Sequence, residues 1–188
     1  PPTMENIISV LQSPNTNLVE MYTNSIILMV AGTVITVIVS SLAAYYLARV
    51  KSRLSGMLRV YFLIGIMVPY VIVYLPLCIL LRNMGIPFGV PILILVFVSG
   101  NISFASFMYT NYVHSLPIEL EEAASIDGAT RFRIFWSILF PLLRPCTATI
   151  AIFVGLGIWN DFQTPLLLGQ VRTITVGIYT AIGPHSAN

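Results

Sequence analysis

The sequence predicts an all-α protein with several membrane-spanning helices, and three observations lead to this fold class. Of its 188 residues, 57% are hydrophobic and 9% are charged, whereas a soluble domain carries about 25% charged residues. Long stretches lack Asp, Glu, Lys and Arg altogether, and a helix needs roughly 20 such residues to cross about 30 Å of hydrocarbon. The basic residues are concentrated in two loops, as in polytopic membrane proteins.

The first charge-free stretch predicts a span over residues 24–48. On it Ser40, Ala44 and Ala48 follow one another at four-residue spacing and form a ridge of small side chains on one helical face. Small residues let membrane helices approach closely. We therefore expect this ridge to pack against another helix.

The second stretch predicts a span over residues 60–81, with Pro69 and Pro76 inside it. A proline within a membrane helix leaves backbone carbonyls that neighbouring groups must satisfy. A kink is expected there, and it is either static or a place where the helix moves.

The third stretch predicts a span over residues 90–113 that carries a polar face. Its hydroxyl side chains follow the spacing i, i+4, i+7 and i+11, so they lie on one side of the helix. They are Ser99, Ser103, Ser106 and Thr110. Because a polar face is costly in lipid, it either lines a water-filled path or makes hydrogen bonds to other helices.

The fourth span is predicted over residues 145–168 and contains Asn160 and Asp161. An acid inside a hydrophobic stretch is by default a functional candidate. Asp161 lies near the end of the span, however, with Pro165 after it, so capping a break in the helix is the alternative role.

Charge distribution predicts the orientation. Seven of the nine basic residues lie in or next to the loops at residues 49–59 and 114–144, which places these loops in the cytoplasm by the positive-inside rule. Residues 1–20 are then an external segment, residues 21–168 the membrane core, and residues 169–188 an external loop. The two cysteines fall near opposite sides of the bilayer, too far apart for a disulfide.

The loop at residues 116–145 is the most informative segment, because it reads as a short acidic helix, a tight turn and an amphipathic helix. We expect Ser115 to cap the first helix, Gly128 to end it in the left-handed conformation, and Thr130 to cap a second helix over residues 131–140 that Pro141 closes. The acids of its first turns suit the helix dipole. Such a segment is either a docking element for a basic partner or a solvated loop.

Three tripeptides in this loop resemble the EAA motif of binding-protein-dependent ABC importer permeases: Glu122-Ala123-Ala124, Asp127-Gly128-Ala129 and Leu139-Phe140-Pro141. Leu116-Pro117 and the later Trp159-Asn160-Asp161-Phe162 are similar to the carbohydrate-uptake branch, specifically to the smaller permease of maltose-type and glycerol-phosphate-type importers. The similarity extends over residues 24–168. The family has six spans, so the resemblance implies that a first and a last span are missing from this sequence.

The resemblance implies a type I importer permease fold in a bacterial or archaeal inner membrane, with a coupling helix that docks on a cytoplasmic ATPase dimer. A second permease subunit, an extracytoplasmic sugar-binding protein and membrane lipid are the other implied partners; nucleic acid and a cofactor are not. The implied coupling residues are Glu119, Glu121, Glu122, Ala123, Ala124, Asp127 and Gly128. The residues expected along the path are Ser99, Ser103, Ser106, Thr110, Asn160 and Asp161. The external loop, with Thr173, Thr175, Tyr179 and His185, matches a segment that reaches the binding protein.

Other functional classes fit less well. The chain has no phosphate-binding GxxxxGK[ST] loop, no HExxH and no GxSxG, so we expect neither ATP hydrolysis nor intramembrane catalysis by this subunit. A secondary transporter or channel subunit is the alternative, but it has no need for an acidic helix-turn-helix of this form.

Overall fold

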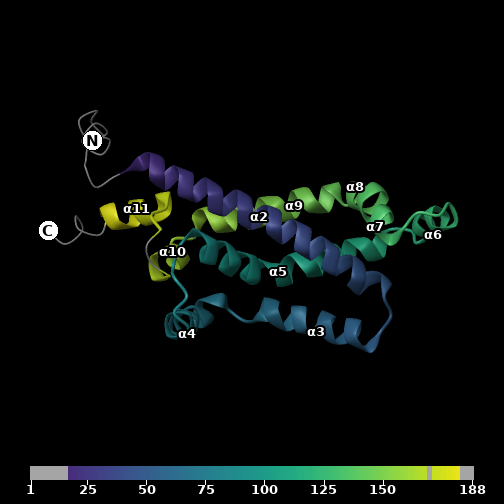
Figure 1. Cartoon of the computed structure of the whole chain (residues 1–188), viewed down its shortest axis with the longest axis horizontal. Coiled ribbons are helices and arrows are strands. Elements are labelled where there is room, and N and C mark those ends of the chain that lie inside the picture. The colour runs from purple at the N-terminus through teal and green to yellow at the C-terminus, as the bar shows by residue number, and fades with distance from the viewer. Residues whose placement is uncertain (1–16, 169–170, 183–188) are drawn as a thin grey trace. The chain divides into compact units, whose positions relative to one another are not determined.

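The computed structural model describes residues 17–168 and 171–182, and every regular element within these ranges is a helix (Figure 1). The chain divides into two compact units, each built from separate stretches of sequence. The first unit comprises the described parts of Pro1–Gly32, Val71–Val96 and Leu156–Asn188. The second unit comprises Thr33–Tyr70 and Phe97–Gly155. The predicted all-α fold is confirmed.

The longest helices are α2 (Leu18–Arg49), α5 (Val90–Ser115) and α9 (Arg144–Asn160). They are apolar around most of their circumference, which is typical of membrane spans. Among the described residues, α2 and α5 are each long and apolar enough to cross a membrane, and two further broken helix pairs bring the number to as many as four. The predicted spans over residues 24–48 and 90–113 each lie within one of these two long helices, and the other two predicted spans fall on sharply bent helix pairs.

Close packing in the second unit joins α2 to α5. Ser40 and Ala44 of α2 are completely buried, and the Ser40 hydroxyl donates to the Ile102 carbonyl of α5 at 3.5 Å. A hydroxyl this near a neighbouring backbone requires small side chains at the contact. The predicted packing role is therefore confirmed for Ser40 and Ala44, and Ala48 is half-buried.

The predicted span over residues 60–81 is interrupted. Helix α3 (Arg53–Met67) ends with Val68 in an extended conformation, and α4 (Tyr70–Asn83) begins after Pro69. A residue that precedes proline is pushed out of the helical region by the proline ring, and proline cannot donate a backbone hydrogen bond. Pro76, by contrast, lies inside α4.

The predicted last span is also shorter than expected, because α9 ends at Asn160 and a separate short helix, α10 (Gln163–Leu167), follows. A further helix, α11 (Ile174–Ile182), lies in the predicted external loop. Its start contacts the beginning of α2, since the Ile174 N–H donates to the Ser25 hydroxyl at 3.1 Å. Both cysteines are free.

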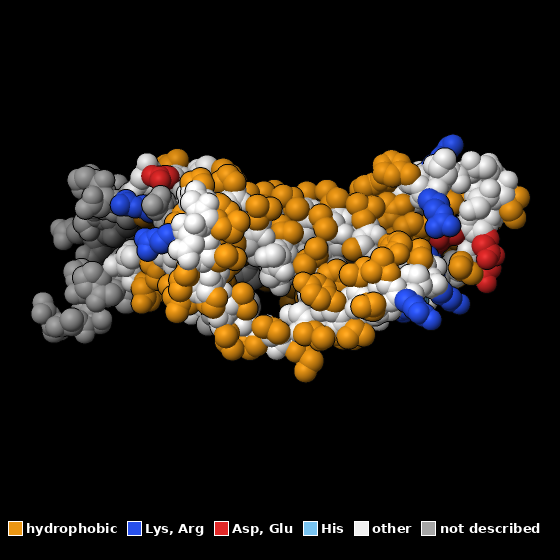
Figure 2. Space-filling view, turned by 60° about the horizontal axis from the view of Figure 1, so that its bottom comes forward, with side chains coloured by type: hydrophobic (Ala, Val, Ile, Leu, Met, Phe, Trp, Pro, Cys, Tyr) orange, Lys and Arg blue, Asp and Glu red, His pale blue; other side chains and the backbone are white. Residues whose placement is uncertain are grey.

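The surfaces of these helices are strongly apolar. Met57 and Met67 of α3 are 71% and 81% exposed, and Leu95 of α5 is 62% exposed. Figure 2 shows hydrophobic side chains across the visible face of the helices. Exposed apolar area on this scale belongs to a protein that meets lipid or other subunits.

Candidate functional site

The acidic loop folds as a helix and a tight turn. Helix α6 (Glu119–Ile126) is followed by Asp127 as its C-cap and by Gly128 with φ +82°. That angle lies in the left-handed region that favours glycine. The Thr130 hydroxyl then accepts the Arg133 N–H at 3.4 Å and caps the next helix. The predicted roles of Gly128 and Thr130 are both confirmed.

The predicted role of Ser115 is wrong. Ser115 is the last residue of α5, and its hydroxyl donates to the Tyr112 carbonyl of that helix at 2.7 Å. The N-cap of α6 is Ile118, which makes no side-chain capping bond. Pro117 explains the displacement, because the residue before it is kept out of the helical region and α6 therefore starts later.

The second helix of the loop runs past Pro141 instead of ending at residue 140. It consists of α7 (Arg131–Ile134), a π-helical segment η1 (Phe135–Leu139) and α8 (Phe140–Leu142). Widening to π geometry just before a proline relieves the clash of its ring with the preceding turn. The chain then bends by 74° into α9.

Helix α6 presents most of its predicted coupling residues to the outside. Figure 2 shows acidic and basic side chains gathered at this end of the second unit. Ile126 and Phe132 beside them are 87% and 71% exposed, so the surface combines negative charge with apolar area. The exposed candidates are Glu119, Glu122, Ala123, Asp127 and Gly128, and Ala124 is half-buried.

Glu121 is the exception among these residues. It is buried, and its Oε1 accepts a hydrogen bond from the Arg49 Nε at 2.7 Å. The Nη2 of the same arginine donates to the Leu116 carbonyl at 3.1 Å. Glu121 therefore faces α2 and not the outside. No spacing in the sequence pairs Glu121 with Arg49, because the two residues lie on different helices.

Asp161 forms a second polar cluster, located in the first unit. Its Oδ1 accepts the backbone N–H groups of Gln163 (2.8 Å) and Thr164 (3.1 Å) at the start of α10. Its Oδ2 accepts the Tyr74 hydroxyl of α4 at 3.2 Å and also contacts the Thr164 hydroxyl. The Asp161 carbonyl accepts the Thr175 hydroxyl at 3.1 Å. The capping role considered for this residue is confirmed.

The sequence did not indicate the partners of Asp161. Tyr74 lies in another span and Thr175 in another segment, and no local spacing connects either one to Asp161. Asn160 is exposed and donates to the Leu156 carbonyl one turn earlier at 2.8 Å. These two adjacent polar residues thus make different contacts: Asp161 bonds to another helix, and Asn160 bonds within its own helix.

The polar face of α5 is largely buried within the second unit. Ser106 is completely buried, and Ser103 and Thr110 are 9% and 6% exposed. Ser103 packs on Gly65 of α3, where an added Cβ would lie only 2.3 Å from its hydroxyl oxygen. Ser99, the member at the other end of the face, is exposed.

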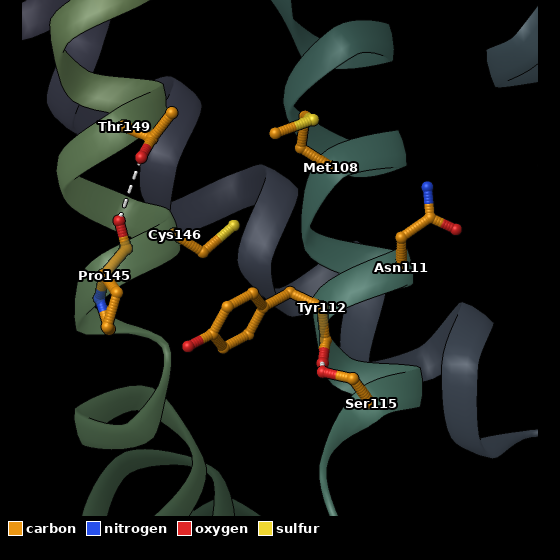
Figure 3. Close-up of a pocket in the computed structure, with 7 residues that line it drawn as sticks. All are labelled: Met108, Asn111, Tyr112, Ser115, Pro145, Cys146 and Thr149. Carbon is orange, nitrogen blue, oxygen red and sulfur yellow. Dashed lines mark hydrogen bonds between the residues drawn. The ribbon is translucent and has the colours of Figure 1, made fainter.

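A gap of 410 Å³ separates α5 from α9 next to the two ends of the acidic loop (Figure 3). Met108 and Tyr112 of α5 point toward α9, and Cys146 of α9 points back. Ser115 and Thr149 donate to carbonyls of their own helices at 2.7 and 3.1 Å. The gap has the size of a ligand pocket, but these two hydroxyls are already engaged in hydrogen bonds.

In the predicted external loop, Thr173 is buried and its hydroxyl accepts the Val176 N–H at 3.3 Å at the start of α11. Tyr179 is 53% exposed and stacks on Phe162 at a centroid distance of 5.0 Å. His185 lies outside the described residues.

Apolar helices of membrane-spanning length, joined by a helix-turn-helix loop with an exposed acidic face, are those of a polytopic membrane protein. The chain belongs to the family of binding-protein-dependent transport system inner membrane components, which matches residues 37–183. The resemblance read from the EAA motif is confirmed at this level.

Several relatives are permeases with sugar-related names. The chain is 35% identical over 174 residues to a probable starch degradation products permease protein, AmyC, of Thermoanaerobacterium thermosulfurigenes, covering 88% of this chain and 61% of the relative. It is 33% identical over 171 residues to the melibiose/raffinose/stachyose import permease protein MelC of Bacillus subtilis, covering 89% and 62%. The chain thus spans about three fifths of the length of these relatives.

A solved structure has the same fold. It is the crystal structure of a bacterial ABC transporter involved in the import of the acidic polysaccharide alginate, with a TM-score of 0.78 and 25% sequence identity. The match covers 95% of this chain and 62% of that chain. The ABC importer permease fold is therefore shown for the described helices.

Proposed function

We propose that this chain is a permease subunit of an ATP-driven sugar importer, where it forms half of the translocation path and couples to a cytoplasmic ATPase through residues 116–145. The observation that carries the proposal is the outward face of α6, which combines exposed acids with exposed apolar side chains and ends in the Gly128 turn. The sugar-related names of its permease relatives support the substrate class.

The chemistry of this face defines the partner surface. Glu119, Glu122 and Asp127 need basic residues opposite them, and Ile126, which is 87% exposed, needs an apolar cleft. Exposed Ala123 lets a partner approach the helix backbone closely. A cleft of this kind on an ATPase would bind α6 as an amphipathic helix in a groove.

The proposed cycle has two states. ATP binding closes the ATPase dimer and moves α6, and the permease pair then opens toward the external binding protein to receive the sugar. Hydrolysis returns the pair to the inward-open state. ATP and the loaded binding protein each shift this equilibrium only as far as their affinities for the two states differ.

The residues proposed to line the translocation path differ in how exposed they are. Ser99 and Asn160 are exposed and accessible to a passing sugar in this conformation, whereas Ser103, Ser106 and Thr110 become accessible only if α5 moves away from its neighbours. Asp161 is held in its own cluster. We retain the α5 face as a proposed path and expect a cysteine at Ser99 to react with a hydrophilic thiol reagent, with a rate that changes when ATP is trapped.

The coupling role is tested by Glu122→Lys, which places the wrong charge on the exposed face of α6. In proteoliposomes with the ATPase, the binding protein and a maltooligosaccharide mixture as probe, we expect loss of substrate-stimulated ATP hydrolysis and of uptake. The matched control is Glu20→Lys, the same charge change at another exposed glutamate. Wild-type coupling in Glu122→Lys would rule out the proposed docking face.

A further inference from the structure

A partly buried ion pair joins α6 to the end of α2. The Arg49 Nε lies 2.7 Å from the Glu121 Oε1, and the two side chains are only 13% and 11% exposed. Charges that are partly buried are screened much less by salt than surface charges are. Removing one partner would leave the other charge uncompensated, which is strongly unfavourable.

Arg49 binds two parts of the loop at once. In addition to Glu121, its Nη2 donates to the Leu116 carbonyl at 3.1 Å, and Leu116 follows the last residue of α5. The planar guanidinium presents several donors in a fixed geometry, which a lysine ammonium does not reproduce. The arginine therefore sets both the position and the orientation of α6 on α2.

A second contact lies one helical turn earlier on α2. The ring of Tyr45 lies 5.6 Å from that of Phe135 in η1, and Phe135 is 1% exposed. Residues four apart occupy the same helical face, so Tyr45 and Arg49 present one surface to both halves of the loop. The last two turns of α2 thus hold α6 and η1 together.

We infer that Arg49 and Glu121 are positioning residues that transmit movement of the coupling helix to α2. This inference rests on the proposed function. Glu121 does not dock on the ATPase, whereas Glu122, its exposed neighbour, does. Helix α2 is continuous over 32 residues, or about 48 Å at 1.5 Å per residue, so a displacement at α6 acts directly on the end of a helix of membrane-spanning length.

The test is a charge exchange across the pair. Arg49→Glu and Glu121→Arg are each expected to reduce substrate-stimulated ATP hydrolysis at least tenfold in proteoliposomes with the ATPase, the binding protein and a maltooligosaccharide mixture. The double exchange is expected to recover at least a third of wild-type stimulation; recovery stays incomplete because the bond to the Leu116 carbonyl is lost. The matched control combines Arg49→Glu with Glu20→Arg, the same charge change at an exposed glutamate outside the loop, which is expected to restore nothing.

A second measurement reports on movement. A cysteine at Val39, a 40% exposed position on α2, is introduced after replacement of Cys78 and Cys146. Its rate of reaction with a thiol reagent is expected to change when ATP is trapped, and Glu121→Gln is expected to reduce this change while the ATPase still co-purifies. The near-isosteric Gln keeps an oxygen acceptor for the Arg49 Nε and removes only the charge, so it is a milder change that remains informative if the charge reversals fail to assemble.

The outcomes separate this inference from the function on which it rests. If Glu122→Lys uncouples transport but the double exchange is no better than the single variants, or Glu121→Gln leaves the Val39 response unchanged, the transmission role is wrong and the docking role stands. If Glu122→Lys has no effect on coupling, the docking role is wrong and the inference falls with it. Recovery of ATP hydrolysis when Arg49→Glu is combined with Glu121→Arg, but not in the control combination, supports both the docking role and the transmission role.

Discussion

Glu121 and Asp161 are both carboxylates held inside a membrane protein, but they are held in different ways. Glu121 is neutralised by one long side chain, Arg49, from another helix. Asp161 is surrounded by neutral donors: two backbone N–H groups of the following turn and the hydroxyls of Tyr74 and Thr164. The first arrangement depends on two side chains, and the second depends mainly on the local backbone.

This difference indicates different tasks. A backbone cap fixes the geometry of a turn, because its donors are two and three residues from the acceptor. An ion pair between two helices joins elements that are distant in sequence, and it is lost if either one moves away. The Asp161 cluster is therefore suited to a static break between α9 and α10, and the Glu121 pair to a joint between elements that move together.

Accessibility to a reagent added outside the cell is the property expected to differ most between the region of α6 and the region that contains Asp161 and α11. Single cysteines at Ser125 on α6 and at Ile178 on α11, both exposed, are placed in a background without Cys78 and Cys146. An impermeant thiol reagent added to intact cells should label Ile178→Cys and not Ser125→Cys, because the basic loops are predicted to be cytoplasmic. Permeabilised cells provide the control, in which both cysteines should react. Labelling of Ser125→Cys alone in intact cells would reverse the topology.

Stability should depend more on Asp161 than on its neighbour. Asp161→Ala removes the acceptor for two backbone donors and for the Tyr74 hydroxyl, and since hydrogen bonds to charged groups contribute about 1.5–3 kcal/mol, we expect a loss of about 2–4 kcal/mol. The purified complex should show a clearly lower thermal unfolding midpoint. Asn160→Ala, which removes one bond at an exposed site, should change it little. Equal midpoints for the two variants would refute the structural role of the cluster.

A substitution in the turn after α6 is expected to have a smaller effect on stability. Gly128 has φ +82°, and an L-residue in the left-handed conformation costs about 1–2 kcal/mol. Gly128→Ala should therefore lower the unfolding midpoint of the complex. Gly56→Ala is the matched control: Gly56 lies inside α3 with open space at its Cβ position, and alanine is favoured over glycine in a helix by about 1 kcal/mol. Shifts of the same sign would contradict this reading of the turn.

Local chemistry was predictable from the sequence, and distant pairing was not. The turn at Gly128, the Thr130 cap and the break at Asp161 follow from residue types at short spacing. Arg49 and Tyr74 each reach a partner in another helix, and no spacing rule indicates such contacts. The start of α6 was misplaced because Pro117 keeps the residue before it out of the helical region, so that Ser115 ends α5 instead of capping α6. The π-helical segment before Pro141 was missed because a proline alone does not show whether a helix ends or widens.

We propose that α6 has two different faces: one docks on an ATPase and the other is held by Arg49. A photo-crosslinking residue at Ile126, which is 87% exposed at the end of α6, tests this in the assembled importer. Met57, 71% exposed on α3 on the same predicted side of the membrane, is the matched control. A crosslink to the ATPase from position 126, with little from position 57, is the predicted result. No crosslink from position 126, or equal yields from both positions, would contradict the account.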